Sequence, residues 1–157
     1  MHRDGNIHLC FMKHQLLGVF REFKPMQRTL SCLTKGGAKT KASKLLEEVV
    51  RTTKSPISFA NAIAHCEPVV ELRSVRVSRM TRQIPIGISN HRQQGVAIRW
   101  LVQAARRKKK KSSIDFSTLL TQQFQEAAMY KGDPVTQRNE LHKVAYSNRV
   151  FAKARWW

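Results

Sequence analysis

The fold of this chain is decided by residues 68–111, where PVVELRSVRVSRMTRQIPIGIS (68–89) runs directly into NHRQQGVAIRWLVQAARRKKKK (90–111). The first half alternates and is rich in Val, Ile and Arg, which is typical of two short β-strands. The second half has apolar residues at helical spacing and ends in six consecutive cations. A narrow ribbon followed by a basic helix favours a polyanionic partner.

The arginines of this ribbon, which we expect over residues 69–88, are regularly spaced. Four of them recur at every third residue: Arg73, Arg76, Arg79 and Arg82. Successive ones therefore fall on opposite faces of a strand. A sheet packed on one face would not carry charge on both faces, whereas a finger that projects into an anionic groove would. The alternative is a surface hairpin with solvated arginines.

Composition bounds the class of protein. The 157 residues suffice for one domain with a moderate core. Lys and Arg number 29 against 10 Asp and Glu, a formal net charge of +19 that favours nucleic acid, with an anionic membrane surface as the rival. A hydrophobic content of 41% is too high for a purely disordered basic tail. We expect one helical domain over residues 25–157, after a poorly patterned extension (1–24) that is either a transit segment or a disordered arm.

The chemistry-bearing residues do not indicate an enzyme. Ten acidic residues are scattered without a carboxylate cluster that would hold magnesium, and no Cys-His or Ser-His arrangement is evident. The odd number and wide spacing of Cys10, Cys32 and Cys66 argue against a disulfide framework, and without a Cys-x-x-Cys pair plain thiols are favoured over a zinc site. We therefore expect no cofactor, no metal and no small-molecule substrate.

The rest of the chain is predicted to be helical. Helices are expected over Pro25–Leu33 and Lys41–Thr53, then from Ser55-Pro56 to just before Pro68. Between the first two, the loop Thr34–Thr40 carries Lys35 and Lys39 beside Gly36 and Gly37, and its exposed backbone amides and lysines suit phosphate oxygens. The alternative is a plain helix-ending loop.

The long helix after the ribbon is predicted to present one polar stripe, made of Arg92, Arg99, Gln103, Arg106 and Lys110. We expect the cation run 106–111 to fray into a flexible loop. A further helix then starts at Ser113 and ends near Gly132. The last helix follows Asp133-Pro134, with its inner face formed by Leu141, Val144, Asn148 and Phe151 and its basic outer face by Arg138, His142, Arg149 and Lys153.

Three separated segments resemble the small-subunit ribosomal protein seven family. The ribbon Val70–Ile88 matches without a gap the family pattern V-E-V-R-S-R-R-V-G-G-x-T-x-Q-V-P-V-E-V, and Val96–Lys108 is similar to its ALALRWLVEAARKR segment. The loop at Lys35-Gly36-Gly37 resembles the K-D-G-K-K-S loop. The closing family pattern is matched by Arg138, His142, Ala145, Asn148, Phe151, Ala152, Arg155 and Trp156.

The resemblance implies a mainly α fold, a six-helix body with a protruding two-stranded antiparallel β-ribbon. It implies a structural protein that binds the 3′ major (head) domain of small-subunit rRNA, helps nucleate head assembly, contacts neighbouring head proteins, and lies near exit-site tRNA and mRNA. Together with the basic stripes, it implies that rRNA is bound by Lys35, Gly36, Gly37, Lys39, Lys41, Arg73, Arg76, Arg92, Arg99, Arg106, Arg107, Lys108, Lys110, Arg138, His142, Arg149, Arg155 and Trp156. The tip, next to tRNA or mRNA, is Ser78, Arg79, Met80, Thr81 and Arg82.

The sequence leaves more than one possibility for the compartment of this protein and for its role. The Arg-Gln-Gln at 92–94 and the Arg-Trp-Trp ending look most like mitochondrial members, which implies the matrix, with the bacterial cytoplasm or a plastid as alternatives. From the basic stripes alone, a free-standing RNA-binding regulator is equally allowed.

Overall fold

The computed structural model describes residues 24–53, 56–77 and 80–153. Six α-helices lie in these ranges: α2 (Lys24–Leu33), α3 (Lys39–Thr53), α4 (Pro56–Cys66), α5 (Asn90–Lys111), α6 (Phe116–Ala128) and α7 (Asp133–Ser147). Strands β1 (Val70–Val77) and β2 (Met80–Gly87) pair antiparallel, and a short 3-10 helix, η1 (Arg149–Lys153), follows α7. The predicted class, a mainly α fold with a β-ribbon, is confirmed. The predicted extension 1–24 falls, apart from Lys24, outside the described residues.

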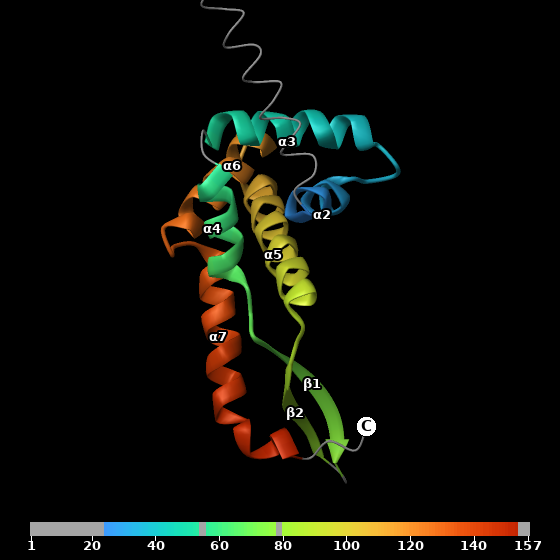
Figure 1. The fold of residues 1–157 in the computed structure, drawn as a ribbon, viewed down its shortest axis with the longest axis vertical. Coiled ribbons are helices and arrows are strands. Elements are labelled where there is room, and N and C mark those ends of the chain that lie inside the picture. The colour runs from blue at the N-terminus through green and yellow to red at the C-terminus, as the bar shows by residue number, and fades with distance from the viewer. Residues whose placement is uncertain (1–23, 54–55, 78–79, 154–157) are drawn as a thin grey trace, which may run out of the picture.

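The core lies where α4, α5 and α6 meet, with α3 across its upper end and α2 beside α5 (Figure 1). Phe59 of α4 and Phe124 of α6 stack with ring centroids 4.4 Å apart, and both are fully buried. From α5, Ile98 and Leu101 fill the space beside them. Such offset aromatic pairs add to the free energy gained by burying their area. This core fixes α5 so that its two ends extend beyond it in opposite directions.

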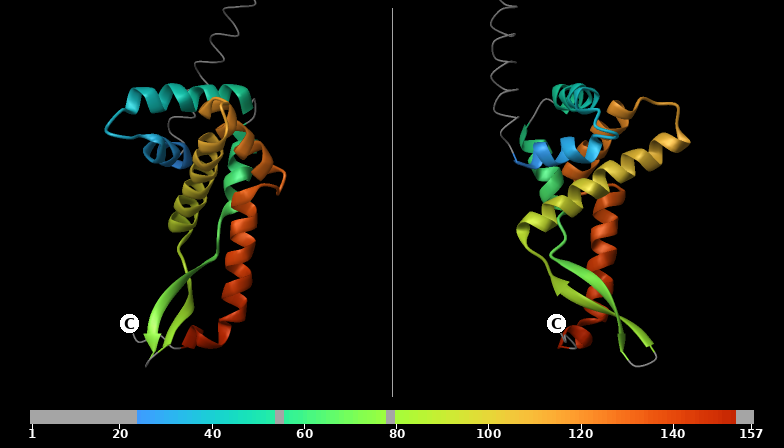
Figure 2. Two further views of the ribbon diagram at one scale, coloured as in Figure 1. Left: turned by 180° about the vertical axis from the view of Figure 1, so that it is seen from behind. Right: turned by 90° about the vertical axis from the view of Figure 1, so that its right-hand side faces the viewer.

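The ribbon leaves the body beside α7, and the views in Figure 2 agree that the two run alongside each other. The register pairs Arg73 with Ile84 and Glu71 with Ile86, so these side chains share one face. Ile84 is completely buried on that face, and the ribbon contacts both α7 and η1. The ribbon protrudes as predicted, but α7 and η1 accompany it, because a two-stranded ribbon alone is barely stable in water.

The cation run at the end of α5 corrects a prediction. Residues 106–111 do not fray into a loop, because α5 stays helical to Lys111. Lys and Arg are good helix formers, and cations interact favourably with the negative end of the helix dipole. Neighbouring segments also hold the run, since Lys108 Nζ lies 3.1 Å from Glu126 Oε2 and Lys109 Nζ donates to the Ile114 carbonyl at 2.9 Å.

The inner face of α7 also differs from the prediction. Val144 is 39% exposed, whereas Pro134, Val135 and Ala145 are buried. Arg138 and His142, predicted on the outer face, are half-buried and bonded to the body. The inner face predicted from residue spacing is therefore rotated about the helix axis by roughly one residue position from the face that is buried. The reason is that α7 packs on β1 and the end of α4 through polar contacts that a hydrophobic pattern does not reveal.

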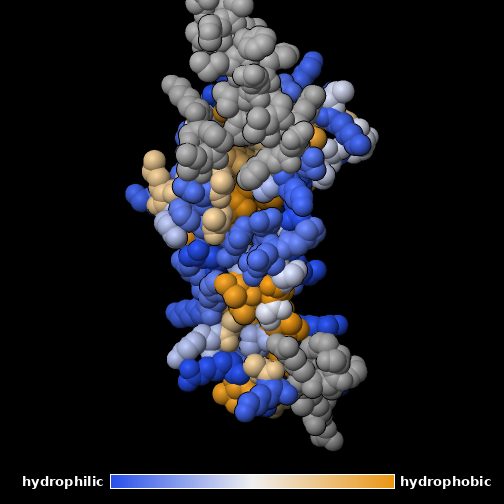
Figure 3. Space-filling model, viewed as in Figure 1, coloured by the Kyte–Doolittle hydropathy of each residue, from blue (hydrophilic) through white to orange (hydrophobic). Residues whose placement is uncertain are grey.

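Hydrophilic residues cover much of the described surface seen in Figure 3, with hydrophobic patches between them. Across the described ranges, none of the helices combines the length and the hydropathy needed to cross a bilayer.

Candidate nucleic-acid interface

The glycine loop after α2 and the basic end of α5 face each other. Gly36 and Gly37 have φ of +55° and +78°, the left-handed backbone that favours glycine, and a Cβ on either would meet open space. The loop turns the chain from α2 into α3 and leaves Lys35, Lys39 and Lys41 exposed. Tertiary structure thus joins two features that the sequence separates by about 70 positions.

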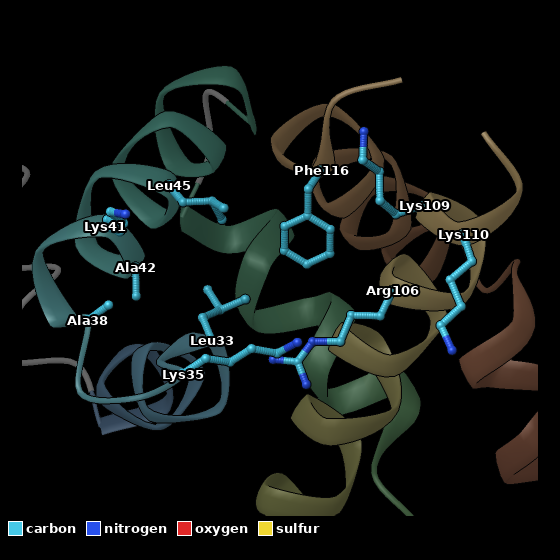
Figure 4. Close-up of a pocket in the computed structure, with 10 residues that line it drawn as sticks. All are labelled: Leu33, Lys35, Ala38, Lys41, Ala42, Leu45, Arg106, Lys109, Lys110 and Phe116. Atoms are coloured by element: carbon cyan, nitrogen blue, oxygen red, sulfur yellow. The ribbon is translucent and has the colours of Figure 1, made fainter. Parts of the chain in front are cut away.

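Between them lies a pocket of about 480 Å³, shown in Figure 4. Its apolar lining comes from Leu33, Ala38, Ala42, Leu45 and Phe116. Its charged lining consists of the cations Lys35, Lys41, Arg106, Lys109 and Lys110. None of the described residues that line the pocket is a carboxylate, so its described lining carries only positive charge, and low-dielectric walls concentrate the field of such charges on a bound anion.

The side chain of Arg106 lines this pocket and is fixed by a hydrogen bond to α2. Its Nη2 donates to the Cys32 carbonyl at the end of α2, at 2.8 Å, and its side chain is partly buried. A guanidinium has five N–H donors in a rigid fork, so this bond fixes its plane and uses one donor. Arg107 and Lys110 are exposed beside it, and Lys108 is paired with Glu126.

Two further arginines of the predicted stripe lie on the outer surface of α5. Arg99 is exposed and its Nε donates to the Gly95 carbonyl of its own helix at 3.1 Å. Arg92 is exposed and forms an ion pair with Glu71 of β1, with Nε 2.8 Å from Oε2. Such a pair contributes little to stability in water, so Arg92 can exchange its partner for a phosphate at low cost.

Arg138 and His142 connect α7 to the body. Arg138 Nη1 donates to the His65 carbonyl at the end of α4, and the Val69 amide donates to His142 Nε2 at 3.1 Å. Burial, and then the positive charge of Arg138, lower the pKa of His142. The placement of both on a basic outer face was therefore wrong. Arg149 is exposed, with its guanidinium 4.5 Å from the centre of the Tyr146 ring.

The ribbon arginines divide as the alternation predicts. Arg73 and Arg76 are exposed on opposite faces. Arg82 is half-buried, with its guanidinium 4.4 Å from the centre of the Phe151 ring, whereas Met80 and Thr81 are exposed. Of the predicted tip residues, Arg82 therefore also packs within the chain. Four predicted site residues lie outside the described residues: Ser78, Arg79, Arg155 and Trp156.

Chemistry at cysteine is disfavoured. Cys66 is completely buried, and burial raises the pKa of its thiol to about 12, so the reactive thiolate is scarce at neutral pH. Among the described residues, no group of three His, Cys, Asp or Glu side chains is arranged to hold a metal ion.

Sequence reasoning missed the apolar half of the pocket and one of its cations, Lys109. A signal existed for the cation, because Arg106, Lys109 and Lys110 stand three and four positions apart and so share one helix face. No such signal existed for Leu33, Leu45 and Phe116, which come from three different helices.

The fold and this surface define a class: a small basic RNA-binding protein with a helical body and a β-ribbon. The sequence pattern of the family described as "Ribosomal protein S7p/S5e" matches residues 13–149, and the chain belongs to that family. It is a structural constituent of the small ribosomal subunit, with rRNA and ribosomal proteins as partners, and it is not an enzyme.

Individual relatives are bacterial and mitochondrial. The chain is 39% identical over 126 residues to "Small ribosomal subunit protein uS7" of Pelagibacter ubique, covering 76% of this chain and 79% of that protein. It is 32% identical over 133 residues to "Small ribosomal subunit protein uS7m" of Reclinomonas americana, covering 81% and 82%. The uS7m protein of Marchantia polymorpha is 40% identical over 100 residues, 63% of this chain and 44% of its own length.

Proposed function

We propose that this protein binds the 3′ major domain of small-subunit rRNA and helps nucleate assembly of the subunit head. The observation that carries the proposal is that the glycine loop and the basic end of α5 converge on one pocket, whose charged residues among those described are all cations. Arg99, Arg92 and the exposed ribbon arginines extend this charge along the molecule. Phosphate contacts of this kind supply most of the positioning energy in nucleic-acid complexes.

The experiment is a salt titration with the full-length protein and a transcript of that rRNA domain. If about 6 phosphates are neutralised, the slope of log K against log salt should lie near −4 to −5. A transcript of the 5′ domain is the matched control and should bind more weakly at every salt concentration. A nearly flat salt dependence, or equal binding to both transcripts, would contradict the proposal.

The exposed end of the ribbon is proposed to serve exit-site tRNA or mRNA. The exposure of Met80, which is 65% exposed, and of Thr81 supports this proposal. Deletion of residues 79–81 should leave small subunits assembling at normal yield while exit-site tRNA dissociates faster or reading-frame fidelity falls. Failure of head assembly in the deletion strain would instead assign the tip to rRNA anchoring.

The mitochondrial matrix is the proposed compartment. Support comes from the similarity to two uS7m proteins, set beside similarity to bacterial relatives. Cell fractionation decides it: the protein should sediment with mitochondrial small subunits, and recovery with plastid or bacterial cytoplasmic ribosomes would refute the assignment.

A further inference from the structure

The pocket at the end of α5 differs from an ordinary phosphate-binding surface because its interior is apolar. Leu33 and Leu45 form two of its walls, and the Phe116 ring points into the space between the helices (Figure 4). All three side chains are only partly buried, and they pack on the core from its edge. A surface that bound phosphates alone would not need an apolar hollow of about 480 Å³.

The shape and the charge together specify a ligand. Volumes of this order are typical of sites that enclose a small organic group. The ring of Phe116 offers a flat face, and base–aromatic stacking is tolerant of base identity because every base has a π-face. The rim is cationic on three sides, from the loop, from α3 and from α5. The ligand that complements this apolar interior and cationic rim is a flat ring with a negatively charged group attached on either side.

We propose that this pocket receives one unpaired nucleotide of RNA, with its base against Phe116 and its flanking phosphates on Lys35, Lys41, Lys109 and Lys110. The inference rests on the proposed rRNA-binding function and adds a specific mode of anchoring. Arg106, whose Nη2 donates to the Cys32 carbonyl, also lines the pocket and adds to its positive charge. An inserted base would fix the register of the protein on its RNA without demanding a particular sequence.

The chain itself offers a competing occupant, residues 1–23. This segment contains Arg3, Lys13 and Arg21 against Asp4 and Glu22, so its net charge is positive. A positively charged segment is repelled by an all-cationic rim, whereas phosphates are attracted. Charge complementarity therefore favours RNA, and the test below includes the segment as an outcome.

The test is a double-mutant cycle between protein and RNA, using the full-length chain. The RNA is a synthetic oligonucleotide that spans the rRNA nucleotides protected by the protein from hydroxyl radicals. Each unpaired nucleotide is replaced in turn by an abasic one. The protein variants are Phe116→Leu, which removes the ring, and Phe116→Tyr, which keeps it. Phe151→Leu is the matched control, an aromatic residue lost outside the pocket.

The expected result is one abasic position that weakens binding to the wild-type protein about tenfold. Phe116→Leu should weaken binding to the intact RNA by about the same factor, and the two changes together should cost no more than either alone. The salt slope should stay unchanged, because no phosphate contact is removed. Phe116→Tyr should bind like wild type, and Phe151→Leu should show no coupling to any abasic position.

Additive effects of Phe116→Leu with every abasic position would overturn the inserted base while leaving salt-dependent rRNA binding intact. That result is also what occupation of the pocket by residues 1–23 predicts. Absence of salt-dependent binding by the wild type would overturn the proposed function and this inference together. If Phe116→Leu loses its helical circular dichroism, Phe116→Met, which also lacks the ring but keeps a long apolar side chain, replaces it in the same cycle, with coupling again expected at the single abasic position.

Discussion

Arg138 in the second turn of α7 donates a hydrogen bond to the main-chain carbonyl of His65, 73 residues earlier at the end of α4. The same guanidinium lies 5.9 Å from the centre of the Tyr130 ring, which in turn stacks on the His65 ring at 3.6 Å. A cation at this point also interacts favourably with the C-terminal end of α4, which is the negative end of its helix dipole. The arginine thus connects the helix that accompanies the ribbon to the helix that leads into it.

We expect Arg138→Ala to lower the free energy of unfolding by about 1.5–3 kcal/mol, the usual range for a hydrogen bond to a charged group. The measurement is urea denaturation followed by circular dichroism. Arg149→Ala is the control, because Arg149 is exposed and its contact with the Tyr146 ring is worth about 0.5–1 kcal/mol. Equal losses in both variants would show that Arg138 has no special structural role.

The bond between His142 and the Val69 amide predicts a pH dependence. His142 Nε2 accepts this bond, so the ring must be neutral there, and the pKa of His142 lies below its ordinary value of 6.5. The unfolded chain therefore takes up the proton at a higher pH than the folded chain does. Lowering the pH through 6.5 should reduce the free energy of unfolding by at most about 1.4 kcal/mol per pH unit, and this effect should vanish above 6.5.

His142→Gln isolates that effect. The variant has no titrating group at this position, so the difference between wild-type and variant stability should change below about pH 6.5 and be constant above it. Denaturation curves between pH 5 and 8 measure the difference. Parallel pH profiles for the two proteins would mean that other histidines account for the whole dependence.

Arg99 is predicted to act on RNA and not on the fold. Its side chain is exposed on α5, and its Nε donates to the Gly95 carbonyl of the same helix. Arg99→Ala should weaken binding to the rRNA transcript and reduce the salt slope by about 1, with stability changed by no more than about 0.5 kcal/mol. Arg99→Lys keeps the charge and should keep the slope. A large drop in melting temperature for Arg99→Ala would contradict this assignment.

Two glycines should respond oppositely to the same substitution. Gly37→Ala should destabilise the protein by about 1–2 kcal/mol, because its φ of +78° is costly for any residue with a Cβ although no atom stands in the way. Gly95→Ala, inside α5 and equally open, should stabilise by about 0.5–1 kcal/mol. Urea midpoints of the two variants should move in opposite directions, and a shift of the same sign would refute the backbone explanation.

Local pattern determined most of the fold. The alternation over Val70–Ile88 and the long amphipathic run after it predicted the ribbon and α5, because period 2 and period 3.6 are properties of the chain itself. The glycine pair after α2 predicted the loop for the same local reason. The excess of Lys and Arg predicted the class of partner, since net charge requires no knowledge of the fold.

Contacts between distant segments decided the rest. The fraying predicted for 106–111 is absent because Glu126 and the Ile114 carbonyl lie within reach of its lysines. The Arg138 side chain points inward because it donates a hydrogen bond to the main-chain carbonyl of His65, 73 residues earlier in the chain. The pocket exists only where α2, α3, α5 and α6 come together. Such features depend on which surfaces meet in space, and side-chain periodicity reports only which surface is apolar, so tertiary structure alone could place them.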